Sequence, residues 1–269
     1  MSLAGVAKET VAIVERGEYT CPSGHVVSLR AAIDAAAAGT VLHRPDDFAD
    51  LTAPAGVGGP PTIEVWADGT AGAARRLAAE GPVAALNFAS AKNPGGGFMG
   101  GAKAQEEDLA RCSALVHCQR TQRDYYEANR AEPSMLYTDH VIYAPRVPFF
   151  RDERLDLLER PFLASVVTAP APNAGEHLRR EPRGHTAISE ALDRRAERVL
   201  RVLAHHGERV LVLGAWGCGV FRNDPAEVAA TFKKWLHAPA YAGVFARVVF
   251  AILDRSRERA TLAAFERAF

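Results

Sequence analysis

From residue 60 onward, the chain alternates short apolar runs with longer amphipathic segments. The apolar runs are nearly continuous, which is typical of strands buried on both faces of a sheet. Strands that alternate with helices indicate an α/β fold, a three-layer α/β/α domain with a parallel or mixed sheet. The expected strands are Thr62–Ala67, Val83–Phe88, His140–Ala144, Phe162–Thr168, Arg209–Leu213 and Arg247–Leu253. The expected helices are Ala71–Ala79, Glu106–Gln122, Ile188–His205, Pro225–Leu236 and Ser256–Phe265.

The first part of the chain has a different pattern. A mild helical periodicity over Leu3–Arg16 precedes two short extended pieces around a Pro-Ser-Gly turn within Tyr19–Val27. The stretch Ala53–Pro61 is rich in Gly and Pro, which disfavour both helix and strand. We therefore expect a small N-terminal accessory segment over residues 1–60 and the main domain over residues 61–269.

The charges of the chain balance. Lys and Arg number 32 and Asp and Glu number 32, so no overall positive field exists to gather duplex nucleic acid. Charged residues interrupt the apolar stretches well before the roughly 20 residues that a membrane helix needs. The N-terminus lacks the basic start and the cleavage site of a secretory signal. We expect neither duplex nucleic acid nor a membrane as a partner, and a cytoplasmic location.

The four cysteines form no metal motif. Cys21, Cys112, Cys118 and Cys218 include no CxxC pair and no histidine at zinc spacing. We expect reduced, packed thiols, with Cys112 and Cys118 on one helix, and no metal site.

The loop after the strand Val83–Phe88 contains five glycines between Gly95 and Gly101. Glycine permits positive φ angles and lets backbone N–H groups approach a ligand without interference from a Cβ atom. The loop ends at Gln105-Glu106-Glu107-Asp108, where an amphipathic helix begins. A ligand-binding loop is therefore favoured over a mobile surface turn.

The acidic residues at the start of this helix have two interpretations. Carboxylates in a first turn complement the helix dipole, an effect worth only about 0.3 to 1 kcal/mol each. Alternatively, they carry out chemistry at the glycine loop. Because adjacent helical residues differ by about 100° around the axis, Glu106 and Glu107 cannot act identically. One can point into a glycine-lined cleft while the other turns to a neighbouring group.

A second glycine-rich loop, Gly214–Pro225, follows the strand Arg209–Leu213. Its end predicts a helix with Asp224 as N-cap and Pro225 at the first position. Glycine-rich backbone before a helix N-terminus is a common cradle for phosphate oxygens, and neither a Walker loop nor GxGxxG is present.

Two aromatic residues border this second loop. Trp216 fits core packing as well as it fits contact with a ligand. Phe221 lies between glycines and polar residues, where an aromatic face could hold a ribose or a base.

Together these two loops carry a family resemblance. The glycine triplet Gly95-Gly96-Gly97 followed by Gln105-Glu106-Glu107 resembles the GGG and QEE signature of bacterial-type poly(ADP-ribose) glycohydrolases, and Gly214–Pro225 resembles their diphosphate loop. The resemblance implies a macrodomain with a mixed sheet, and ADP-ribose lying across the strand ends. It covers about residues 60–269 together with an N-terminal extension.

The resemblance also implies roles for single residues. Glu107 matches the catalytic glutamate, and Glu106 matches the neighbour that orients the scissile ribose. Phe221 matches the aromatic residue that holds the distal ribose. The other implied ADP-ribose contacts are Asn87, Asn93, Gly95, Gly96, Gly97, Gln105, Gly217, Cys218, Gly219 and Val220.

The implied reaction is hydrolysis of ribose-ribose O-glycosidic bonds, with release of ADP-ribose and with Glu107 as general acid and base. The expected partners are poly(ADP-ribose), ADP-ribose and poly(ADP-ribosyl)ated proteins, and no cofactor is expected. Two alternatives stay open: a non-catalytic ADP-ribose-binding macrodomain, and a hydrolase of mono-ADP-ribosylated substrates. A nucleotide phosphohydrolase is more remote, because it would need carboxylate-bound metal ions.

Overall fold

A mixed sheet of seven strands forms the centre of the computed structural model, which describes residues 1–269. The strands are β1 Glu18–Thr20, β2 Val26–Ser28, β3 Val41–His43, β4 Thr62–Trp66, β5 Ala84–Phe88, β6 Val141–Arg151, β7 Leu157–Ala169, β8 Val210–Leu213 and β9 Arg247–Ala251. The order in the sheet is β3-β6-β7-β5-β8-β9-β4, while β1 and β2 form a separate hairpin. β3, β6 and β7 pair antiparallel, and the pairs from β7 through β5, β8 and β9 to β4 are parallel.

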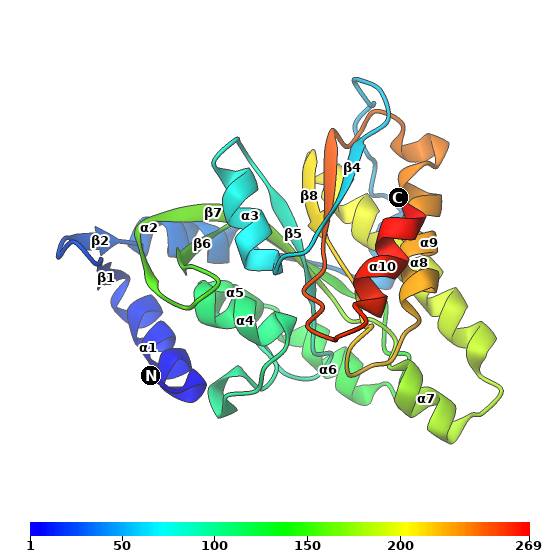
Figure 1. The fold of residues 1–269 in the computed structure, drawn as a ribbon, viewed down its shortest axis with the longest axis horizontal. Helices are drawn as coiled ribbons and strands as arrows, with labels where there is room; N and C mark the ends of the chain where they lie inside the picture. The colour runs from blue at the N-terminus through cyan, green and yellow to red at the C-terminus, as the bar shows by residue number, and fades with distance from the viewer.

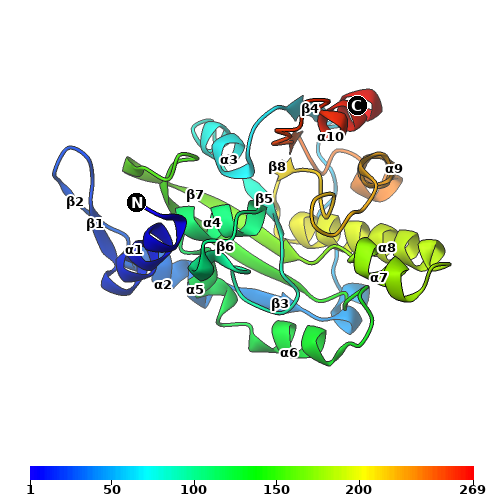
Figure 2. The same ribbon diagram turned by 60° about the horizontal axis from the view of Figure 1, so that its bottom comes forward.

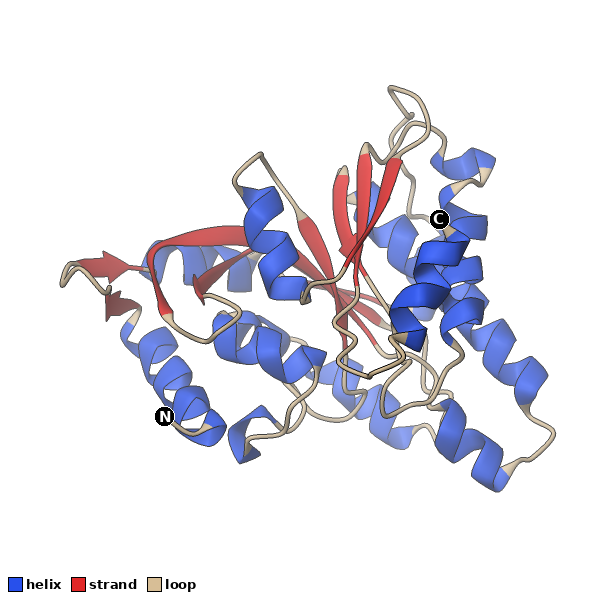
Figure 3. Ribbon diagram, viewed as in Figure 1, coloured by secondary structure: helices blue, strands red, loops and turns tan.

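Helices cover both faces of this sheet (Figures 1 and 3). They are α1 Leu3–Arg16, α2 Arg30–Ala38, α3 Thr70–Ala78, α4 Gln105–Cys112, α5 Leu115–Gln119, α6 Arg123–Ala131, α7 Ala174–Arg180, α8 His185–His205, α9 Pro225–Leu236 and α10 Ala260–Ala268. Helices α8, α9 and α10 pack in the core on one face, and α1 to α5 pack in the core on the other. The three-layer α/β/α architecture with a mixed sheet is thus confirmed.

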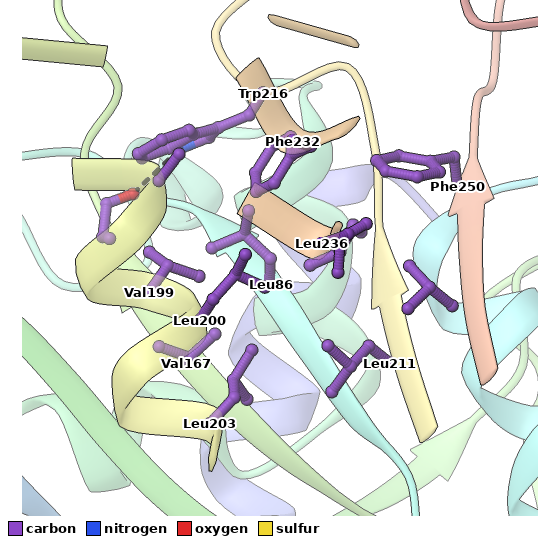
Figure 4. Packing of buried hydrophobic residues seen from close by; sticks show 14 of the residues in the cluster. Leu86, Val167, Val199, Leu200, Leu203, Leu211, Trp216, Phe232, Leu236 and Phe250 are labelled. Carbon is purple, nitrogen blue, oxygen red and sulfur yellow. Dashed lines mark hydrogen bonds between the residues drawn. The ribbon is translucent and has the colours of Figure 1, made fainter. Parts of the chain in front are cut away.

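The two cores follow from the alternation of side chains along each strand. On β5, Leu86 packs toward α8 and α9, whereas Ala85 packs on the opposite face. Val167 and Leu211 join Leu86 in the first core, and Figure 4 shows these side chains interdigitating with those of α8 and α9. Full burial of one such aliphatic side chain is worth about 1.5 to 3 kcal/mol. A strand buried on both faces therefore reads as a continuous apolar run.

The first 60 residues share this sheet and its core. β3 is an edge strand paired with β6, and α2 packs on β6. Ile13 and Ile33 lie in the same buried cluster as residues of β5 and β7. The composition change near residue 60 lies in the stretch that connects β3 with β4. An accessory role for residues 1–60 stays a proposal.

The expected helix Glu106–Gln122 is wrong as a single element. The chain breaks at Ser113, which is extended and bridges to Phe149 of β6, so that α4 and α5 are separate helices. Cys112 and Cys118 consequently lie on different helices, and all four cysteines are free. The helices α2, α6 and α7 and the strand β3 were not expected from the sequence pattern. Among all the helices, none combines the length and the apolar composition needed to cross a bilayer.

Candidate active site

The two glycine-rich loops lie beside each other at the carboxyl ends of the parallel strands. β5 and β8 are parallel neighbours, so the loops that follow their carboxyl ends start side by side (Figure 2). β7 ends at the same edge because it is also parallel to β5. Ligands of such sheets bind outside the carboxyl ends of the strands. The topology therefore brings together the two loops that the sequence singled out.

The first loop is shaped around the carboxyl group of Glu107. Gly95 and Gly96 have φ angles of 69° and 56°, in the left-handed region that favours glycine. A Cβ atom on Gly96 would lie 2.4 Å from Glu107 Oε1. The backbone N–H of Gly97 donates to the same oxygen at 2.9 Å. Glycine at these positions thus allows the backbone to touch the Glu107 carboxylate directly.

Glu106 turns into the protein, as the helical spacing predicted for one of the pair. Only 3% of its surface is exposed. Its Oε1 accepts hydrogen bonds from Asn87 Nδ2 at 3.0 Å and from Gln119 Nε2 at 2.9 Å. Its Oε2 accepts from the backbone N–H of Ser90 at 2.6 Å. All of these donors come from neutral groups.

Burial dominates the ionisation of Glu106. It raises the pKa of this carboxyl group from 4.5 to about 7, against the lowering effect of the three donors, and the nearby Glu107 adds to the rise. The would-be Cβ of Gly96 lies 3.2 Å from Glu106 Oε2, so both carboxyl groups face the same glycine. Glu106 therefore titrates near neutral pH at the wall of the glycine loop.

Gln105 ties the start of α4 to β5. Its Nε2 donates to the carbonyl of Leu86 at 2.7 Å and to Thr70 Oγ1 at 3.1 Å, and its Oε1 accepts from the N–H of Phe88 at 2.8 Å. These bonds hold the two glutamates against the strand end. The amide group is engaged by the protein, and its contact with a ligand stays a prediction.

The two asparagines expected at the site differ in burial. Asn87 is fully buried and also donates to Thr168 Oγ1 at 3.2 Å, while its own Oδ1 has no partner. Asn93 is exposed in the loop, where its carbonyl accepts from the N–H of Gly96 at 3.0 Å. The side chain of Asn93 is thus accessible to a ligand, whereas the amide of Asn87 is engaged by Glu106.

The N-terminal helix α1 supports the glycine loop from behind. Ala7 packs with Phe98 of this loop and with Ala110 of α4. Thr10 Oγ1 donates to the carbonyl of Arg111 at 2.7 Å. The sequence pattern carried no signal for this contact.

The second loop presents its backbone at the same edge. Gly217 has φ 73°, and a Cβ atom there would lie 2.3 Å from Asn223 Nδ2. Asn223 is buried and donates to the carbonyls of Pro172 and Gly217, which holds the loop in shape. Gly219 is exposed, as is Val220, 82% of whose surface is accessible, and Cys218 is half-buried. Asp224 caps α9 by accepting from the N–H groups of Ala226 and Glu227, as expected.

The two aromatic residues of this loop have separate places. Trp216 is fully buried, donates from Nε1 to the carbonyl of Ala169 and packs near Phe232, so the core interpretation is confirmed. Phe221 is half-buried, and its ring lies 5.9 Å from that of Tyr137.

Tyr137 was not identified from the sequence. It adopts φ 62°, which is uncommon for a residue with a large side chain. The guanidinium of Arg195, fully buried in α8, donates to the carbonyls of Tyr137 and Leu136 and pairs with Asp139. A buried cation thus holds the aromatic neighbour of Phe221 in an unusual conformation.

The chemistry available at this edge consists of paired carboxyl groups, backbone N–H donors and an aromatic face. No cluster of three or more His, Cys, Asp or Glu side chains is arranged to hold a metal ion. The arrangement is suited to proton transfer beside an anionic ligand held by backbone groups.

Comparison with protein families decides the assignment. The family model of the microbial-type PARG catalytic domain matches residues 7–152, more than half of the 269-residue chain. The chain belongs to the microbial-type poly(ADP-ribose) glycohydrolase family. The match begins at residue 7, inside α1, so most of the N-terminal helix lies within the matched range.

Solved structures of this family resemble the chain over nearly its whole length. Poly(ADP-ribose) glycohydrolase from Thermomonospora curvata is 46% identical, with a TM-score of 0.94 and 99% of each chain covered. The same enzyme bound to the inhibitor ADP-HPD matches with a TM-score of 0.91, 46% identity and 99% of each chain covered. The Deinococcus radiodurans enzyme in complex with ADP-ribose is 46% identical, with a TM-score of 0.83 and coverage of 90% of this chain and 98% of that one. Comparison with curated proteins found no match.

Proposed function

We propose that this chain hydrolyses poly(ADP-ribose) at its ribose-ribose O-glycosidic bonds and releases ADP-ribose, with Glu107 as the catalytic acid. The observation that carries this assignment is the Glu107 carboxyl group, held on the N–H of Gly97 beside the buried Glu106, in a chain of the microbial-type poly(ADP-ribose) glycohydrolase family. We also propose the macrodomain type of α/β/α fold for residues 61–269.

The proposed mechanism starts with protonation of the departing ribose oxygen by Glu107. Cleavage of a glycosidic bond passes through an oxocarbenium-like transition state, which nearby negative charge stabilises. The diphosphate of the substrate itself, held at the backbone of Gly217–Val220, would supply that charge. Glu107 would then accept a proton from the attacking water, which completes the hydrolysis.

The remaining residues would place the substrate. Glu106 Oε2 faces Gly96 and is available to accept a hydrogen bond from a ribose hydroxyl. Phe221 would pack on the distal ribose, supported by the Tyr137 ring. Asn87, Asn93, Gly95–Gly97 and Cys218–Val220 are proposed ADP-ribose contacts. Because most of these contacts use backbone groups, binding is expected to tolerate side-chain changes at the catalytic pair.

The test is incubation of the purified chain with poly(ADP-ribose) and identification of the product by mass spectrometry. Free ADP-ribose is expected with wild type, and a 10²- to 10⁴-fold slower release, roughly, with Glu107→Gln. Glu127→Gln, at an exposed glutamate of α6, is the matched control. Binding of ADP-ribose should survive in both variants. Near wild-type hydrolysis by folded Glu107→Gln would overturn the assignment of the acid.

The same assay separates the alternatives. Binding of ADP-ribose without release from polymer would indicate a binding module, and preference for a mono-ADP-ribosylated substrate would indicate the other hydrolase class. Loss of activity in chelator would point to metal-dependent phosphohydrolysis. We further propose poly(ADP-ribosyl)ated proteins as substrates and the cytoplasm as the location, which cell fractionation can check.

A further inference from the structure

Gln119 is a buried amide whose side chain makes a single hydrogen bond. It lies at the end of α5, with no exposed surface, and its Nε2 donates to Glu106 Oε1 at 2.9 Å. Its own Oε1 has no partner. A buried amide whose oxygen has no hydrogen-bond partner costs free energy. The one hydrogen bond of the Gln119 side chain, to Glu106, offsets part of this cost.

The break between α4 and α5 makes this contact possible. In an unbroken helix, residues 106 and 119 would be separated by about 20 Å along the axis and would project about 140° apart around it. Instead, Ser113 is extended, bridges to Phe149, and its Oγ donates to the carbonyl of Leu109, while the N–H of Ala114 donates to the carbonyl of Pro148. Strand β6 thus interrupts the helix and turns α5 back, so that Gln119 meets the first turn of α4.

The two oxygens of Glu106 have different surroundings. Oε1 faces inward and accepts from Asn87 and Gln119, whereas Oε2 accepts from Ser90 N–H and lies at Gly96. Two donors on the inner oxygen fix the rotation of the carboxyl plane. The outer oxygen consequently keeps one lone pair toward the glycine loop.

We propose that Gln119 is a positioning residue that holds the Glu106 carboxylate with Oε2 turned to the scissile ribose. This role rests on the proposed hydrolysis of poly(ADP-ribose). The side-chain hydrogen bond of Gln119 goes to Glu106, so its proposed effect on turnover passes through Glu106.

The role has a consequence for pH dependence. Glu107, Tyr125 and Tyr126 are coupled electrostatically to Glu106, and none of them carries a positive charge. Ionised Glu106 is therefore stabilised by its neutral donors only. Loss of the Gln119 donor raises the pKa of the Glu106 carboxyl above its wild-type value of about 7. As the pH falls, the Glu106 carboxylate is then protonated at a higher pH than in wild type.

The test compares wild type, Gln119→Leu and the control Gln122→Leu in poly(ADP-ribose) hydrolysis from pH 5 to pH 9. Gln122 is a nearby amide that donates to the carbonyl of Thr40 and to Thr121 Oγ1, whereas the donors to Glu106 are Ser90, Asn87 and Gln119. A hydrogen bond to a charged group corresponds to roughly a ten-fold or larger change in equilibrium. Gln119→Leu should thus move the acidic limb of the pH profile upward by about one pH unit. The ionised fraction of Glu106 at pH 7 then falls from about one half to about one tenth, so kcat at that pH should fall about five-fold, with a smaller change in KM. Gln122→Leu should match wild type.

NMR titration of carbon-13-labelled glutamate carboxyl groups follows the ionisation of Glu106 without turnover. The Glu106 signal is assigned by its absence in Glu106→Gln. If wild type fails to hydrolyse the polymer, the proposed function fails, while this titration still reports on Gln119. An unchanged acidic limb, or an unchanged Glu106 titration in folded Gln119→Leu, would overturn the positioning role. If Gln119→Leu does not fold, Gln119→Met replaces it, because the unbranched thioether side chain has nearly the length of glutamine and also removes the donor to Glu106.

Discussion

Replacement of Glu106 by glutamine is expected to stabilise the protein at alkaline pH while it impairs turnover. The unfolded chain releases this proton near pH 4.5, but the folded protein releases it only near pH 7. The folded state thus binds more protons across that window, and wild-type stability falls as the pH rises through it. A neutral side chain of the same shape removes this loss.

The expected gain follows from the two pKa values of Glu106. Ionisation of the buried carboxyl reduces the free energy of unfolding by about 3 kcal/mol at pH 8, but by only about 1 kcal/mol at pH 5. For 269 residues, an unfolding entropy of about 2 cal/mol/K per residue converts 3 kcal/mol into a rise in Tm of roughly 5 °C.

The surroundings can accept a glutamine. Asn87 Oδ1 and Gln119 Oε1 have no hydrogen-bond partner. If the amide groups of Asn87 and Gln119 rotate by 180°, their oxygens can accept from Nε2 of the glutamine at position 106. Oε1 of that glutamine can still accept from Ser90 N–H. The substitution therefore leaves no buried donor opposed to another donor.

The assay is thermal unfolding of wild type, Glu106→Gln and the exposed control Glu127→Gln at pH 5 and pH 8. The Tm advantage of Glu106→Gln should be several degrees at pH 8 and should shrink at pH 5, while Glu127→Gln shows little change. A Tm below wild type at pH 8, or an advantage independent of pH, would refute the reasoning.

Other changes test the loops and a histidine cluster. Gly96→Ala should reduce kcat at least 10²-fold, because its Cβ atom would lie 2.4 Å from Glu107 Oε1 and its φ is 56°, and wild-type kinetics would contradict the loop geometry. Phe221→Ala should lower turnover about ten-fold or more with a nearly constant Tm, since this half-buried ring lies on a proposed ligand loop; a large loss of Tm with unchanged turnover would place it in the core. Burial and the neighbouring His43 lower the pKa of His206 from 6.5 to about 4. Between these two values the unfolded state binds more protons than the folded state, so the free energy of unfolding falls as the pH drops from 6.5 to 4. After a discount for partial exposure, that loss is about 1 to 2 kcal/mol, and denaturant titrations should show less of it in His206→Phe.

Prediction from the sequence was most reliable where the signal was local. Helices α1 and α9 begin and end where the pattern indicated, because amphipathic periodicity and caps such as Asp224 act within a few residues. Strands β4, β5, β8 and β9 were recognised as apolar runs. β6 and β7 extend beyond the expected runs, into residues whose pairing depends on the partner strand.

Within the candidate site, the sequence identified the groups that lie next to one another in the chain. The glycine triplet, the Glu106-Glu107 pair and the second loop are each contiguous, and their different environments follow from helix geometry. Their roles toward a ligand stay predictions. Gln119 and Tyr137 were missed because nothing in their neighbourhood along the chain distinguishes them from packing or loop residues.

By itself, the sequence determined the α/β layering, the two glycine-rich loops and the acidic pair, since these depend on periodicity and on contacts between near neighbours. Only the tertiary structure decided which glutamate is buried and which amides hold it. The interruption of the helix at Ser113 depends on β6, more than 30 residues away along the chain. The integration of residues 1–60 depends likewise on pairing of β3 with β6. Such contacts arise from the burial of surfaces that are far apart in the chain, and no local pattern records which surfaces will meet.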